Sequence, residues 1–191
     1  YAVEHAAEYQ RDVDAYVDKV LSGEIVACEW IVLACRRYLN DLASCRWDFR
    51  PEPACEIIAI IETTLCHQQG EFLDASPLRG TPFYLLPYHK FICFNIMGFY
   101  LKGTNKRRFK EALDFIPRKN VKTTFAASLA WALALYERRS GSKVYEVGGA
   151  LKQALEGFDF LKYNVYRLGV TVKEDAERGL RITDNNMEHS I

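Results

Sequence analysis

The stretch that most limits the fold of this chain is FIPRKNVKTTFAASLAW, residues 115–131. A short apolar run ends at a proline, a basic loop follows, and an alanine-rich segment typical of a helix begins near Lys122. Phosphate-binding loops have this order, because the N–H groups that open a helix hold phosphate together with a lysine and a hydroxyl. Lys122 and Thr123 occupy the positions of that lysine and hydroxyl. The pattern predicts a nucleotide site.

The full motif GxxxxGK[ST] is not met, because Ile116 and Val121 stand at its two glycine positions. A basic turn capped by threonine at the start of a core helix is the alternative interpretation of the motif alone. Glycine tolerates a positive φ at the second position, whereas a β-branched residue there costs about 1–2 kcal/mol. We therefore expect a distorted or empty loop that binds ATP weakly.

The spacing of apolar residues predicts two kinds of organisation along the chain. Residues 1–75 form a helical N-terminal region, with one apolar face made of Tyr9, Val13, Tyr16, Val17 and Val20. Residues 76–110 read as a connector, which begins in a proline-rich loop. In residues 111–191 the order is strand, helix, strand, helix, with EALDFIP and SKVYEVGG as the strands. That order is typical of a three-layer α/β fold with a largely parallel sheet.

Composition excludes few functional classes. Of the 191 residues, 25 are basic and 25 are acidic, so a nucleic-acid surface would have to be a local patch. The basic run at residues 102–110 could contact DNA phosphates, or it could be a solvated connector. The six cysteines form no CxxC pair and are expected to be reduced thiols, mostly in the core. No signal peptide or bilayer-spanning apolar run is visible, so no membrane partner is expected.

The residues around the loop, DFIPRKNVKTTFAASLAWALAL, closely resemble the large terminase subunit of tailed bacteriophages. The segments VLSGEIVACEWIVLACRRYLNDL, LLPYHKFICFNIMGF, RRFKEALDFIPRKN, KVYEVGGALKQA and RITDNNMEHSI are also similar to this family, in order, over nearly the whole chain. The family usually lacks the first glycine, so Ile116 fits it, whereas Val121 is a departure. The resemblance implies an α/β protein, in which a helical region precedes the first half of a P-loop NTPase.

The resemblance also implies roles for individual residues. Lys122 would contact the β and γ phosphates of ATP, and Thr123 would hold Mg²⁺. Arg118 would be catalytic by stabilising charge on the γ-phosphate, unless it is a solvated loop charge. His89 stands near the position where the family has a glutamine that reads adenine, although it could equally be a histidine on a helix surface. The remaining cofactor-binding residues of the loop would be Lys119, Asn120, Val121 and Thr124.

The function implied is that of a DNA-packaging ATPase and endonuclease, which moves viral or prophage DNA into a procapsid in the cytoplasm of the bacterial host. Its partners would be duplex DNA, the small terminase subunit and the portal protein, and it would assemble as a homo-oligomeric ring. No Walker B strand is found, and the family places that strand and the nuclease domain beyond this chain. We therefore expect the chain alone to be inactive as an ATPase. The alternative is a non-catalytic relic or truncated DNA- or protein-binding module with a defective P-loop.

Overall fold

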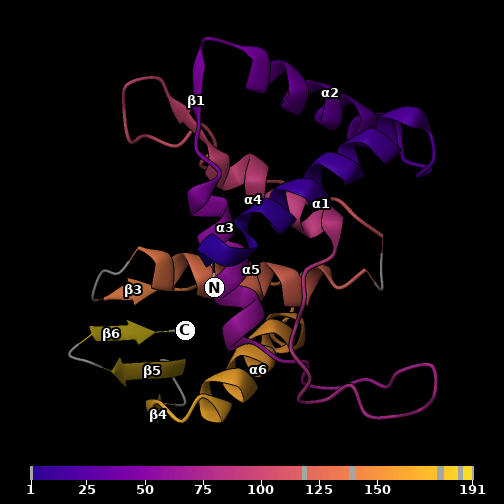
Figure 1. The fold of residues 1–191 in the computed structure, drawn as a ribbon. Helices are drawn as coiled ribbons and strands as arrows, with labels where there is room; N and C mark the ends of the chain where they lie inside the picture. Colours follow the sequence, from indigo (N-terminus) through magenta and orange to yellow (C-terminus); the bar gives the residue numbers. More distant parts are fainter. Residues whose placement is uncertain (1, 118–119, 138–140, 176–178, 185–186, 191) are drawn as a thin grey trace. The chain divides into compact units, whose positions relative to one another are not determined.

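The computed structural model describes residues 2–117, 120–137, 141–175, 179–184 and 187–190. Helices dominate these ranges and the strands are short (Figure 1). None of the described helices combines the length and the apolar character needed to cross a bilayer. In chain order the elements are α1 (Ala2–Ser22), α2 (Glu29–Ala43), β1 (Trp47–Phe49), α3 (Glu52–Thr64), α4 (Pro87–Gly98), β2 (Phe99–Leu101), α5 (Lys122–Tyr136), β3 (Ser142–Lys143), α6 (Leu151–Arg167), β4 (Thr171–Asp175), β5 (Gly179–Asp184) and β6 (Met187–Ser190).

The predicted three-layer α/β fold with a largely parallel sheet is wrong. Residues 111–116 form no strand, and Leu113 and Phe115 are 92% and 94% exposed. The second expected strand is reduced to β3, after which Tyr145 and Val147 are exposed. Strands β4, β5 and β6 pair antiparallel, and within the described residues only the two-residue pairing of β3 with β6 is parallel. A parallel sheet needs strands that are covered on both faces, and the apolar residues of these two runs are not covered.

The predicted helices are confirmed where the apolar period is strong. Of the five residues predicted for the apolar face of α1, Tyr9, Val13, Val17 and Val20 are buried and Tyr16 is half-buried. The helix ends before Gly23, whose φ of +81° suits the left-handed position that terminates helices.

The chain divides into two compact units that are interleaved in sequence. Unit 1 contains residues 1–59 and 85–113, and unit 2 contains residues 60–84 and 114–191. This division differs from the expected limits of 1–75, 76–110 and 111–191, because residues 60–75 belong with the C-terminal part of the chain. Helix α3 contributes residues to both units.

Aromatic packing forms the core of unit 1. The ring of Tyr38, fully buried on α2, meets the rings of Phe49, Phe91 and Phe99 edge to face, with centroids 6.2, 5.5 and 5.8 Å away. Such pairs stabilise a core beyond the area they bury. Burial raises the pKa of Tyr38 to about 12, so its hydroxyl stays protonated at neutral pH. Strands β1 and β2, which carry Phe49 and Phe99, pair antiparallel beside it.

The basic run at residues 102–110 is partly built into unit 1. Arg108 forms an ion pair with Asp41, and its guanidinium lies 4.3 Å from the ring centroid of Trp47. The ammonium of Lys102 donates a hydrogen bond to the Cys45 carbonyl at 3.1 Å. The expectation that this run is only a solvated connector is therefore wrong for Arg108, and contact with DNA stays a prediction for the exposed Lys106 and Lys110.

All six cysteines are free, and four of them are buried, as expected for reduced thiols. Burial raises the pKa of Cys35 and of Cys55 to about 11. Both thiols therefore stay protonated and poorly reactive at neutral pH. Cys28 and Cys45 are exposed, so the core prediction does not extend to them.

A fully buried amide organises unit 2. The side chain of Asn164 on α6 accepts a hydrogen bond from the Cys66 N–H at 2.7 Å. It also donates to the carbonyls of Cys66 and Phe160, at 3.1 and 3.0 Å. Nearby, the indole N–H of Trp131 on α5 donates to the Thr64 hydroxyl at 3.1 Å. The end of α3 is thus joined to α5, and the segment that follows it is joined to α6.

We predict that Asn164→Ala lowers the free energy of unfolding by about 3 kcal/mol, because it leaves buried backbone groups of Cys66 without their partner. Asn105→Ala is the matched control, since Asn105 is exposed and accepts one hydrogen bond, from Arg50 at 2.9 Å. Urea unfolding followed by far-UV circular dichroism measures both. Equal stability of the two variants would show that the Asn164 amide does not organise the unit.

Candidate functional site

The loop singled out in the sequence leads into the N-terminus of α5. Val121 is the residue before the helix, with φ 57° and ψ 14°. The first helical hydrogen bond runs from the Phe125 N–H to the Val121 carbonyl, at 2.8 Å. The N–H groups of residues 122–124 precede that bond, so they have no acceptor within the helix. Unsatisfied N–H groups and the positive end of the helix dipole favour an anion at this position.

The left-handed backbone of Val121 confirms the expectation for this position. Among the described residues, only Ala75 and Val121 combine a side chain with a positive φ. A β-branched side chain in this region is strained, because its Cβ crowds the following carbonyl oxygen. The isopropyl group is 41% exposed, so the strained position lies at the surface rather than in the core.

A cleft of about 930 Å³ opens beside this loop, within unit 2. One wall is the start of α5, and the other walls are residues 144–148, part of α6 and Asp114. The residues predicted to bind the cofactor that line it are Val121, Lys122, Thr123 and Thr124. Its volume lies in the range of pockets that hold small molecules and cofactors.

Two carboxyl groups stand in the same cleft as Lys122. Burial raises the pKa of Asp114, and the positive charge of Lys122 opposes part of that rise. Burial also raises the pKa of Glu146. Glu146 lies against α6 where that helix has Gly157, since a Cβ at residue 157 would stand 2.0 Å from the Glu146 Oε1. Each carboxyl group therefore takes up its proton at a higher pH than usual. As the pH falls, the two groups lose their negative charge and repel an anion less.

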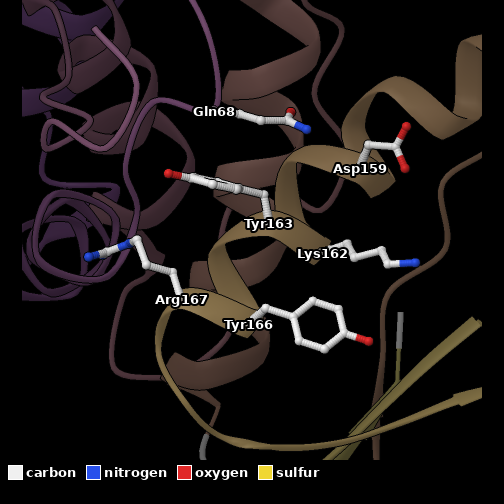
Figure 2. Close-up of a pocket in the computed structure, with 6 residues that line it drawn as sticks. All are labelled: Gln68, Asp159, Lys162, Tyr163, Tyr166 and Arg167. Atoms are coloured by element: carbon white, nitrogen blue, oxygen red, sulfur yellow. The ribbon is translucent and has the colours of Figure 1, made fainter. Parts of the chain in front are cut away.

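Unit 2 has two further pockets. A pocket of about 460 Å³ shares Thr123, Thr124 and Glu156 with the cleft. A third pocket, of about 540 Å³, shares Gln68 and Asp159 with the second. Figure 2 shows this third pocket, with Gln68 next to the ring of Tyr163 and the side chains of Asp159 and Arg167 extending to opposite sides. We refer to the three pockets, which share lining residues in pairs, as the groove of unit 2.

The donor atoms in the cleft suit a hard cation more than a soft one. Thr123 offers a hydroxyl and Asp114 a carboxylate, and oxygen donors of this kind, with phosphate oxygens, are what Mg²⁺ prefers. Among the described residues, no three His, Cys, Asp or Glu side chains gather as a metal site by themselves. Any Mg²⁺ would therefore depend on phosphate oxygens for most of its coordination.

Asn120 is not among the residues that line the cleft. Asn120 is exposed and its amide donates a hydrogen bond to the Pro117 carbonyl at 3.3 Å, back into its own loop. Arg118 and Lys119 lie outside the described residues.

His89 belongs to unit 1, whereas the loop belongs to unit 2. It is 1% exposed, so the alternative of a histidine on a helix surface is wrong. Its Nδ1 accepts a hydrogen bond from the Leu86 N–H at 3.3 Å, at the start of α4. Burial lowers the pKa of His89 to about 4, so the ring is neutral at physiological pH. His89 therefore helps to cap the N-terminus of α4.

Sequence reasoning missed Glu146, Gln68 and Asp159 as residues that line the groove. Glu146 fell inside an expected strand, and the two others carry no motif. The glycine at position 157, in the interior of a helix where glycine is costly, was the one available signal of a close approach by another group.

No protein-family model, no curated protein and no solved structure matches the chain. The likeness to terminases consequently rests on the quoted motifs.

We predict that Val121→Gly raises the free energy of unfolding by about 1 kcal/mol, because the strain relieved exceeds the extra freedom that glycine has in the unfolded chain. Val26→Gly is the matched control, since Val26 is 97% exposed and has no positive φ to relieve. Urea unfolding of both variants provides the comparison. A loss of stability in Val121→Gly equal to that of the control would show that the loop is unstrained.

Proposed function

We propose that unit 2 binds ATP with Mg²⁺ in the cleft at the N-terminus of α5. In this proposal Lys122 and the N–H groups of residues 122–124 hold the phosphates, and the Thr123 hydroxyl contributes to Mg²⁺. The observation that carries the proposal is the left-handed Val121 placed directly before Lys122 and Thr123, all three of which line a cleft of about 930 Å³. The proposal depends on this loop and helix and does not require a parallel sheet.

The resemblance to terminases supports a wider proposal for the whole protein. The chain would be the ATP-binding N-terminal portion of a large terminase subunit, working in the cytoplasm of a bacterial host. The complete protein would couple ATP hydrolysis to translocation of duplex DNA into a procapsid and would cut DNA with a separate nuclease domain. The small terminase subunit and the portal protein would be its partners, and a homo-oligomeric ring its assembled form.

One observation favours the alternative of a non-catalytic module. The Val121 side chain, 41% exposed, is extra bulk at the place where phosphate would approach the loop. If this bulk excludes phosphate, the chain would act through other surfaces, as a DNA- or protein-binding module with a defective loop. Binding of inorganic tripolyphosphate separates the two proposals, because only the first requires it.

We predict that the chain binds Mg²⁺–ATP weakly, that Lys122→Ala weakens this binding at least about tenfold, and that Val121→Gly tightens it by about tenfold. Lys110→Ala is the matched control, because Lys110 is an exposed lysine of unit 1. Isothermal titration calorimetry measures all four proteins. A phosphate-release assay should detect no turnover, since no Walker B acid pair is present to orient water.

Binding that survives Lys122→Ala unchanged would place ATP elsewhere on the chain. Turnover that disappears in Lys122→Ala would instead show that an acid within this chain, such as Asp114 or Glu146, activates water.

A further inference from the structure

One wall of the cleft is an extended segment, residues 144–148, which we call the strap. Its side chains alternate, since Tyr145 and Val147 are exposed and Glu146 between them is half-buried. Among the described residues, no hydrogen bond joins the backbone of residues 145–148 to another part of the chain. A contact other than sheet pairing must therefore hold the strap at the cleft.

The side chain of Glu146 provides such a contact, because it reaches α6 at Gly157. This glycine is buried in the interior of the helix, where glycine is unfavourable relative to alanine. A Cβ at residue 157 would stand 2.0 Å from the Oε1 of Glu146 and 2.6 Å from its Cδ and Oε2. The carboxyl group thus occupies the space that any larger residue would fill, and we call this space the notch. Burial raises the pKa of Glu146, as expected for a carboxyl group that packs against a helix.

Glycines stand on both sides of the strap. Gly141, with a φ of +83°, precedes β3, and Gly148 and Gly149 come shortly before α6 begins at Leu151. Glycine accepts large changes in backbone angles, and hinges often lie at small residues. A segment held by one side chain between two such places can move without disturbing the helices on either side.

We propose that the strap closes the cleft and that Glu146 fastens it by placing its carboxyl group in the notch at Gly157. The ligand retained is the nucleotide of the proposed ATP site, on which this inference rests. Lys122 lies in another wall of the same cleft, so the strap and the phosphate-binding residues border the same space. Release of a bound ligand is slower while Glu146 stays in the notch, and the strap opens when Glu146 leaves it.

Gly157→Ala tests the strap by filling the notch. Alanine favours the helix, so the variant should stay folded while the flexible Glu146 side chain is displaced. The ¹⁵N order parameters of the amides of residues 144–148 should fall from about 0.85 to below about 0.6. Glu146→Ala should give the same loss, whereas Glu146→Gln, which keeps the shape of the side chain, should give none. Asp159→Ala is the matched control, because Asp159 is an exposed residue of the same helix that does not line the cleft.

The double variant shows whether the two residues act through one contact. Once Glu146 has been replaced by alanine, Gly157→Ala should cause no further loss of order, because the displaced group is already absent. Stopped-flow release of a fluorescent ATP analogue with Mg²⁺ should be at least about threefold faster in each single variant, which is the lower range of coupling between contacting residues. The double variant should release it no faster than the single variants.

Three results would overturn the proposal. Order parameters that stay unchanged in both Gly157→Ala and Glu146→Ala would show that the notch does not hold the strap. Additive losses in the double variant would show that the two residues act separately. Release that is equally fast in all variants would show that the strap does not retain the ligand. A coupled loss of order in a chain that binds no nucleotide would instead reject the ATP site and support the fastening, so the two failures are distinguishable. Circular dichroism of each variant shows that a loss of order does not come from unfolding.

Discussion

The hydrogen bonds between the Asn164 side chain and the backbone of Cys66 are the constraint on which unit 2 depends. A buried amide is costly unless its donors and acceptor are satisfied, and here each group bonds to the backbone. The same bonds fix the start of the segment that carries Gln68, while the Trp131 contact with Thr64 fixes the helix before it to α5. The satisfied amide therefore holds the start of the segment that carries Gln68 against α6.

The parts of the fold that could be predicted from the sequence are those that depend on neighbours in the chain. The apolar period of α1 is a local property, so Tyr9, Val13, Val17 and Val20 were predicted as core and are buried. A strand is different, because it needs a partner that may lie anywhere in the sequence. The apolar run around Phe115 has the composition of a buried strand, yet no sheet covers it and the ring is exposed.

The candidate site shows the same limit. The left-handed backbone at residue 121 could be predicted, because the motif calls for glycine there and the following residues open a helix. The place of Gln68 could not, since it is set by bonds to a residue 98 positions away from Cys66. Likewise, nothing local in the sequence around His89 indicates that its ring is buried at the start of α4.

The interleaving of the two units has a consequence for the order in which the chain matures on the ribosome. Unit 1 is complete in sequence once residue 113 has been made, whereas the backbone of Cys66 must wait for Asn164. At ordinary elongation rates the 98 residues from Cys66 to Asn164 take roughly 5–20 s to make. During this time, Ile61 near the end of α3 and Leu65 directly after the helix have been made, whereas α6 of the same unit is still incomplete. A nascent chain of this kind exposes apolar side chains to which chaperones can bind, and slow codons between residues 113 and 164 would prolong that exposure.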